Sequence, residues 1–138
     1  MSLRDHYERT TYRVTGVTPA IDIRIGAHCP PLDQLLNQYG ARTWAFITAW
    51  NPGSTKLGSE ENRRRQNALE AEAKQAGYII YRGAGVPNAA GWEPEESILI
   101  LGIYREDAVK LGGKFEQLAV VVGEQGRAAE LIDFNKNI

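Results

Sequence analysis

The residues best placed to do chemistry lie in the segment from Trp50 to Ser59, between an apolar run and a helical pattern. Ligands of α/β folds collect at strand ends, and helix N-termini offer free N–H groups, so Asn51 and Ser54 are candidate ligand-binding residues. A Walker phosphate loop is excluded, because it needs a Gly-Lys-Ser/Thr ending and Gly58 is followed by Ser59. An ordinary loop with helix-capping residues is the alternative interpretation.

Asn62 lies seven residues before Leu69, and therefore on the same stripe of the expected helix, facing the core. A buried amide must find hydrogen-bond partners, because leaving it unsatisfied costs about 1–3 kcal/mol. Two interpretations stay open. We favour a clamp on the backbone of residues 51–57, and the alternative is an amide that faces a ligand.

A second candidate region is the glycine-rich loop that leads into an acidic segment before the next strand. Trp92 in this loop could stack on a ligand or close over it. Glu95 and Glu96 could act as an acid–base pair or bind a divalent cation, with Lys56 or Lys114 as electrostatic support. A solvated acidic rim, with Trp92 anchoring its own loop, is the alternative.

Other familiar chemistries find no support in the sequence. His28 and Cys29 are adjacent, so an extended chain turns them to opposite faces and they form no nucleophile–base pair. The two histidines and one cysteine are too few for a convincing zinc site. We find no fingerprint of α/β hydrolases, zinc proteases or dinucleotide-binding folds. The sequence therefore predicts no metal site and leaves any cofactor unknown.

Composition limits the classes of partner and compartment. The 138 residues favour a single globular domain, residues 1–138, and one cysteine excludes an internal disulfide. A net charge of −1 argues against strong nucleic-acid binding, which needs a basic surface. The N-terminus shows no secretory signal, and no apolar run approaches the roughly 18 residues of a membrane span. We therefore expect a cytoplasmic protein without membrane association.

The elements that must position these residues follow from hydrophobic periodicity and turn signals. They predict an α+β domain of order ββαβαββαββ, with about three helices packed on a mixed, mostly antiparallel sheet of six to seven strands. Both alternating faces of residues 43–50 are largely apolar, which predicts a central strand covered on both sides. The predicted strands are residues 11–17, 20–25, 43–50, 78–81, 97–103, 118–122 and 128–134, and the predicted helices are residues 32–39, 59–76 and 105–117.

Several motifs resemble those of the domain-of-unknown-function 3293 family. They are Tyr7-x-x-Thr10-x-Tyr12, Ala45-Phe-Ile-Thr-Ala-x-Asn51-Pro52, Glu61-Asn62, Trp92-x-x-Glu95-Glu96-Ser97, Gly102 and Lys114-Phe115-x-Gln117-x-Ala119. The resemblance covers about residues 7–122, although Leu118 stands where the family pattern has Asn. It implies a small bacterial stand-alone protein with no assigned reaction. It also groups one set of polar residues: Thr10, Tyr12, Asn51, Glu61, Asn62, Glu95, Glu96 and Gln117.

Three functions stay open. We favour the binding of a small polar or nucleotide-like ligand at the end of the central strand. The alternatives are a hydrolase or transferase that uses a glutamate general base, and a structural or protein-interaction domain that forms a homodimer through its terminal hairpin. The candidate ligand-binding residues are Thr10, Tyr12, Asn51, Ser54, Asn62, Trp92, Glu95, Glu96, Lys114 and Gln117.

Overall fold

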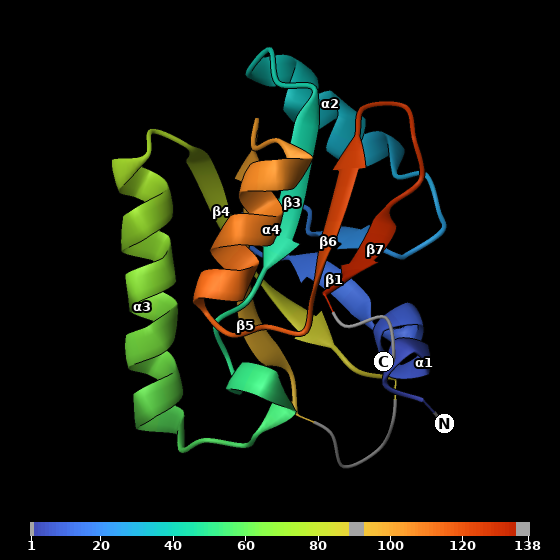
Figure 1. Ribbon diagram of the computed structural model, residues 1–138. Helices are drawn as coiled ribbons and strands as arrows, with labels where there is room; N and C mark the ends of the chain where they lie inside the picture. Colours follow the sequence, from blue (N-terminus) through green and yellow to red (C-terminus); the bar gives the residue numbers. More distant parts are fainter. Residues whose placement is uncertain (1, 89–92, 135–138) are drawn as a thin grey trace.

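The computed structural model describes residues 2–88 and 93–134, whose strands form one curled sheet with helices on both faces (Figure 1). The strands are β1 (Thr11–Val14), β2 (Ile21–Ile23), β3 (Thr43–Ile47), β4 (Ile79–Val86), β5 (Glu95–Leu101), β6 (Ala119–Glu124) and β7 (Glu130–Asp133). The helices are α1 (Leu3–Arg9), α2 (Pro30–Gln38), α3 (Ser59–Gln75) and α4 (Arg105–Lys114), with a 3-10 turn η1 (Pro52–Ser54). The predicted α+β class is confirmed.

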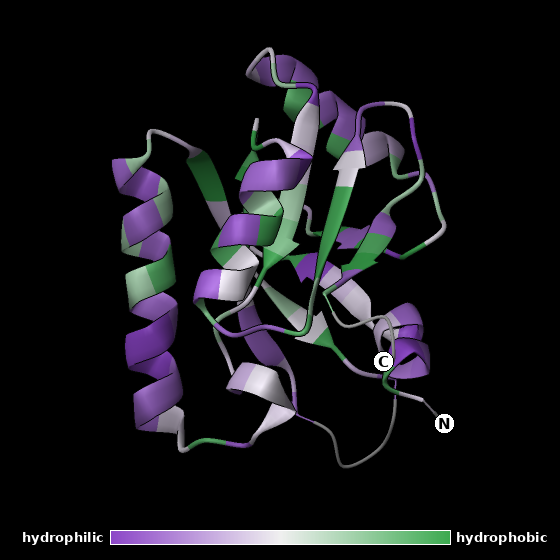
Figure 2. Ribbon diagram, in the orientation of Figure 1, coloured by the Kyte–Doolittle hydropathy of each residue, from purple (hydrophilic) through white to green (hydrophobic). Residues whose placement is uncertain are grey.

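Strand β3 lies inside the sheet, with a separate apolar core on each of its faces. Trp44 and Phe46 belong to the core beneath α2, whereas Ala45 and Ile47 belong to the core beneath α3 and α4. All four side chains are buried, as predicted for a strand covered on both sides. Hydrophobic residues accordingly gather on the central strands, while α3 is hydrophilic over most of its surface (Figure 2).

The topology brings the termini of many strands to the same end of the sheet. The strand order is β2-β1-β4-β5-β3-β6-β7, and each neighbouring pair is antiparallel. Strands β3 and β4 are both antiparallel to β5, so they run in the same direction and are joined by α3 in a crossover with β5 inserted between them. Consequently β3 and β4 terminate at the end of the sheet where β1, β5 and β6 begin.

A helix precedes the first strand, where the sequence analysis predicted no element. The Ser2 hydroxyl accepts a hydrogen bond from the Asp5 N–H, and the Asp5 carboxylate accepts one from the Ser2 N–H, each over 3.1 Å. This reciprocal capping box starts α1. No residue of the helix is fully buried, although Tyr7 packs against the core, so the helix lacks the wide apolar stripe on which the prediction relied.

Strand β4 is longer than predicted, because residues 83–86 pair with β1 and are not part of the glycine-rich loop. Gly83 lies opposite Val14, and a Cβ atom there would come within 2.4 Å of the Arg13 carbonyl oxygen. Glycine is unfavourable in strands in general but is needed where backbones approach this closely. The loop prediction was wrong here because it relied on composition alone.

The terminal hairpin of β6 and β7 was predicted, and with it a dimer through exposed apolar edges. Leu131 is buried in one core, and Ile132 and Phe134 pack against the other. These side chains therefore face the interior, and the homodimer stays a prediction. Among the described residues, no helix has the length and apolar character needed to cross a membrane.

Candidate functional site

A cavity of about 180 Å³ lies at the end of the sheet where these strand termini meet. Its lining combines aromatic and aliphatic side chains with hydroxyl, amide and carboxylate groups, the composition that typifies small-molecule sites. The lining residues are Leu3, His6, Tyr7, Arg9, Thr10, Tyr12, Phe46, Thr48, Ser54, Gly85, Pro87, Asn88, Glu93, Glu95, Ser97, Gln117, Ala119, Val120 and Val121.

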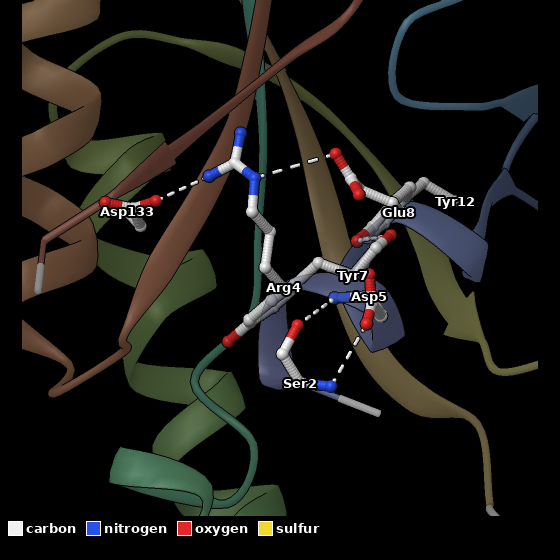
Figure 3. A network of polar contacts seen from close by, with 7 residues as sticks. All are labelled: Ser2, Arg4, Asp5, Tyr7, Glu8, Tyr12 and Asp133. Atoms are coloured by element: carbon white, nitrogen blue, oxygen red, sulfur yellow. Dashed lines mark hydrogen bonds and ion pairs between the residues drawn. The ribbon is translucent and has the colours of Figure 1, made fainter. Parts of the chain in front are cut away.

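Helix α1 forms one wall of the cavity and is held there by polar contacts (Figure 3). The Arg4 guanidinium lies 2.6 Å from the Asp133 carboxylate of β7. The Tyr12 hydroxyl of β1 donates a hydrogen bond to the Tyr7 carbonyl over 2.8 Å. Of the residues in this region, only Thr10 and Tyr12 are candidates from the sequence. The Ser2-x-x-Asp5 capping spacing is the signal that could have revealed the helix.

The structure brings half of the candidate residues together around this cavity: Thr10, Tyr12, Ser54, Glu95 and Gln117. Asn51 and Asn62 are not part of the lining, but Asn51 donates a hydrogen bond to Glu95, and Asn62 donates one to Asn51. The Glu96 carboxylate forms an ion pair with Arg63 over 2.7 Å, and the Lys114 ammonium pairs with Glu72, so neither lines the cavity. Trp92 lies outside the described residues.

Asn62 is a clamp on the loop that leaves the central strand, as the sequence analysis favoured. Its side chain is 1% exposed, and its Oδ1 accepts a hydrogen bond from the Asn51 N–H over 2.8 Å. Its Nδ2 donates to the Asn51 Oδ1 over 2.8 Å and to the Leu57 carbonyl over 3.3 Å. Asn51 has a φ of 47°, in the left-handed region that asparagine tolerates better than most residues. The clamp therefore holds a backbone turn that few side chains permit.

Two further side chains of α3 hold the same stretch of backbone. The Gln66 Oε1 accepts a hydrogen bond from the Ala49 N–H over 3.0 Å, and the Arg65 Nε donates to the Ala49 carbonyl over 3.1 Å. Arg65 also donates to the Phe115 carbonyl over 2.7 Å, which connects this stretch to the end of α4. Neither role is predictable from the sequence, because polar side chains on a mostly hydrophilic helix resemble a solvated face.

The loop after β3 does not form a phosphate cradle. The N–H groups of Ser54 and Thr55 bond to backbone carbonyls of the turn itself, and the Leu57 N–H donates to the Asn51 Oδ1 over 3.0 Å. The Gly53 N–H donates to the Glu116 carbonyl over 2.7 Å. Anion sites of this kind need several unpaired N–H groups converging on one point, so this loop is a structural connection.

Glu95 is the carboxylate that the fold places against the cavity. The Asn51 Nδ2 donates a hydrogen bond to its Oε2 over 3.0 Å. No lysine or arginine among the described residues forms an ion pair with it. Burial raises the pKa of Glu95, and the bond from Asn51 opposes part of that rise. A carboxylate of raised pKa in a cleft is a recognised mark of a functional site.

Two tyrosines share this environment. Burial, with a smaller contribution from the Glu95 charge, raises the pKa of Tyr7 to about 12. Burial also raises the pKa of Tyr12, followed by the effect of Tyr7. Both phenols therefore keep their protons at neutral pH, and neither adds negative charge to the cavity.

The burial of Glu95 should make the stability of the protein depend on pH. Its folded pKa lies above its unfolded value of about 4.3, so its contribution to stability is full below that value and is lost as the pH rises through the folded pKa. We expect Glu95→Gln to raise Tm at neutral pH by roughly 2–4 °C, with the gain shrinking toward about pH 4. Thermal denaturation across this pH range measures the effect.

Glu96→Gln is the matched control, because Glu96 is the adjacent residue and pairs with Arg63 at the surface. A surface ion pair contributes less than about 1 kcal/mol, so its loss should leave the shape of the pH profile unchanged. The cavity lining also contains His6, Arg9 and Glu93, and both variants retain all three. Parallel pH profiles for the two variants would contradict the assignment to Glu95.

Comparison with known proteins places the chain in one family. Among the described residues, no group of three or more His, Cys, Asp or Glu side chains could hold a metal ion. No curated protein and no solved structure matches the chain. The model of a family described as proteins of unknown function, DUF3293, matches residues 47–120, more than half of the sequence, including the clamp and Glu95. The chain therefore belongs to the DUF3293 family.

Proposed function

We propose that the protein binds a small polar molecule in the cavity between α1 and this end of the sheet. The observation that carries the proposal is Glu95, a half-buried carboxylate that lines the cavity and has an amide but no cation as its partner among the described residues. An uncompensated buried charge is costly in a folded protein. Such a group persists at functional sites, where a ligand supplies the missing interaction.

The size of the cavity limits the ligand. Sites for drug-sized molecules occupy about 300–1,000 Å³, and this cavity occupies about 180 Å³. A single ring with polar substituents fits this space better than a complete nucleotide. Phe46, Tyr12 and Val121 offer apolar contacts to such a ring.

Glu95 favours one second candidate function, general-base catalysis on the bound molecule. A glutamate whose pKa is raised by burial is a stronger base than a solvated one and works closer to neutral pH. In a catalytic protein, Glu95→Gln would abolish turnover while leaving the binding of a neutral ligand intact. Glu96 and Lys114 lie outside the cavity lining, so the structure offers them no comparable role.

A thermal-shift screen tests the binding proposal, using nucleobases, nucleosides, amino acids, amines and sugar phosphates against the purified protein. A ligand present at 100 times its Kd stabilises a protein by about 2.7 kcal/mol, which raises Tm by several degrees at this chain length. Gly85→Leu should abolish the shift, because Gly85 lines the cavity. A Cβ atom there meets nothing closer than 3.6 Å, so a side chain can begin at this position without displacing the backbone.

Gly113→Ala serves as the control glycine substitution, because this position faces open space on α4 and is not part of the cavity lining. It should preserve the shift produced by any ligand of the wild type. Equal shifts in Gly85→Leu and in the wild type would place binding elsewhere and overturn the proposal.

A further inference from the structure

Four hydroxyl groups of the cavity lining donate their protons to backbone carbonyl groups of the protein. Thr10, Tyr12 and Ser97 each donate to a backbone carbonyl group, over 2.6, 2.8 and 3.0 Å. The Thr48 hydroxyl also donates to a backbone carbonyl, over 2.6 Å, and accepts a hydrogen bond from the Trp50 N–H. A hydroxyl has one proton and two lone pairs, so what these groups still offer to a ligand is acceptor capacity.

The amide in the cavity lining is oriented in the same way. The Gln117 Nε2 donates to the Trp50 carbonyl over 3.2 Å and to the Phe115 carbonyl over 3.3 Å. Its Oε1 accepts no hydrogen bond from the described residues. Gln117 is 9% exposed, and these two bonds fix which end of the amide is consumed by the backbone.

Glu95 adds a negative charge to this set of acceptors. Asn51 occupies its Oε2, and its Oε1 has no hydrogen-bond donor among the described side chains. The Tyr7 phenol, near enough to feel the Glu95 charge, keeps its proton and contributes one donor. Next to the Tyr7 proton, this part of the lining offers a carboxylate, an amide carbonyl and several hydroxyl lone pairs as acceptors, while Arg9, Asn88 and Ser54 bring further donors to the lining.

Building on the proposed function, we propose that the ligand of this cavity is a small organic cation rich in N–H donors, of the amidinium, guanidinium or aryl-ammonium class. Its charged group would pair with Glu95, and its N–H donors would use the acceptors that the hydroxyls and Gln117 leave open. Tyr12 and Phe46, whose ring centroids lie 5.5 Å apart at 70°, supply aromatic surface, which attracts cations over its faces.

The arginine of the lining fits this arrangement. Arg9 belongs to α1 and is exposed to solvent. It forms no ion pair with Glu95, and burial is the main cause of the raised pKa of that carboxyl. The Glu95 carboxylate therefore remains available to pair with the charge of a ligand.

Three isosteric probes that differ in charge test the proposal: benzamidinium, benzamide and benzoate. Each is titrated into the labelled protein while the amide NMR signals of Tyr12, Gly85 and Glu95 are followed. We expect benzamidinium to bind more tightly than benzamide by about tenfold or more, and benzoate to bind most weakly. In Glu95→Gln the benzamidinium affinity should fall by about tenfold while that of benzamide stays the same. In Glu96→Gln both affinities should match those of the wild type.

Benzamide or benzoate binding as tightly as benzamidinium would overturn the cation assignment and leave the cavity as a ligand site. The same conclusion follows if Glu95→Gln binds benzamidinium as well as the wild type does. Absence of shifts at the cavity with all three probes would overturn the proposed function together with the cation assignment. Gly85→Leu identifies shifts that come from binding elsewhere, because those shifts persist when the cavity is filled.

Discussion

Replacing Asn62 with alanine should reduce the free energy of unfolding by about 3 kcal/mol and lower Tm by roughly 10 °C. The substitution removes three hydrogen bonds from a side chain that is 1% exposed. It leaves the Asn51 N–H and the Leu57 carbonyl without their partner and opens a small cavity under the loop. Urea denaturation of both proteins at neutral pH measures the difference.

Asn67→Ala is the control, because Asn67 lies on the same helix and is exposed. Alanine is the better helix former, so this variant should be as stable as the wild type or up to about 0.5 kcal/mol more stable. Asn62→Asp keeps the acceptor for the Asn51 N–H but replaces the two donated bonds with repulsion between oxygens, so it should be destabilised as well. Equal stability of Asn62→Ala and Asn67→Ala would mean that the clamp contributes nothing.

Two adjacent glycines of α4 should respond to alanine in opposite directions. A Cβ atom at Gly112 would lie 2.5 Å from the Val120 Cγ1 and 3.0 Å from the Phe134 ring, so α4 would have to move away from the sheet. We expect Gly112→Ala to lose about 2–3 kcal/mol of stability. At Gly113 nothing lies within 4 Å, and alanine there should add about 0.5–1 kcal/mol through its helix propensity and the reduced entropy of the unfolded chain.

Because both substitutions bring the same gain in helix propensity, the difference between them isolates the cost of the close contact between α4 and β6. Thermal and urea denaturation of the two variants give that difference directly. Two variants of equal stability would show that α4 can move away from Val120 at no cost, against the close packing of this interface.

The clamp shows how far sequence reasoning could reach. The spacing of Asn62 and Leu69 predicts that the amide is buried, and the rule that buried amides bond to backbone groups favours the following loop as its partner over a ligand. The periodicity gave no means to see that Arg65 and Gln66 hold the same backbone. A helix with a mostly hydrophilic surface conceals such contacts, because polar residues there are usually solvated.

The cavity shows where that reasoning stops. Its walls come from α1 and from the ends or beginnings of β1, β3, β4, β5 and β6. Only the strand order brings these segments to the same end of the sheet. Strand periodicity puts Glu95 and Glu96 on opposite faces. It does not say which face holds the cavity, so both were candidates. The register between β4 and β5, with Ala84 opposite Glu96 and Gly85 opposite Glu95, decides that Glu95 lies beside Gly85.

The sequence by itself determined the α+β class, the buried central strand and most of the element order, and it favoured the clamp at Asn62, because hydrophobic period and local capping act over a few residues. Tertiary structure alone decided that β5 lies between β3 and β4, that α1 forms a wall of the cavity, and that Gly112 is required by packing. These depend on contacts between residues far apart in the chain, such as Arg4 with Asp133 and Gly112 with Val120 and Phe134. No local pattern encodes them, because each depends on where two separate elements finally pack.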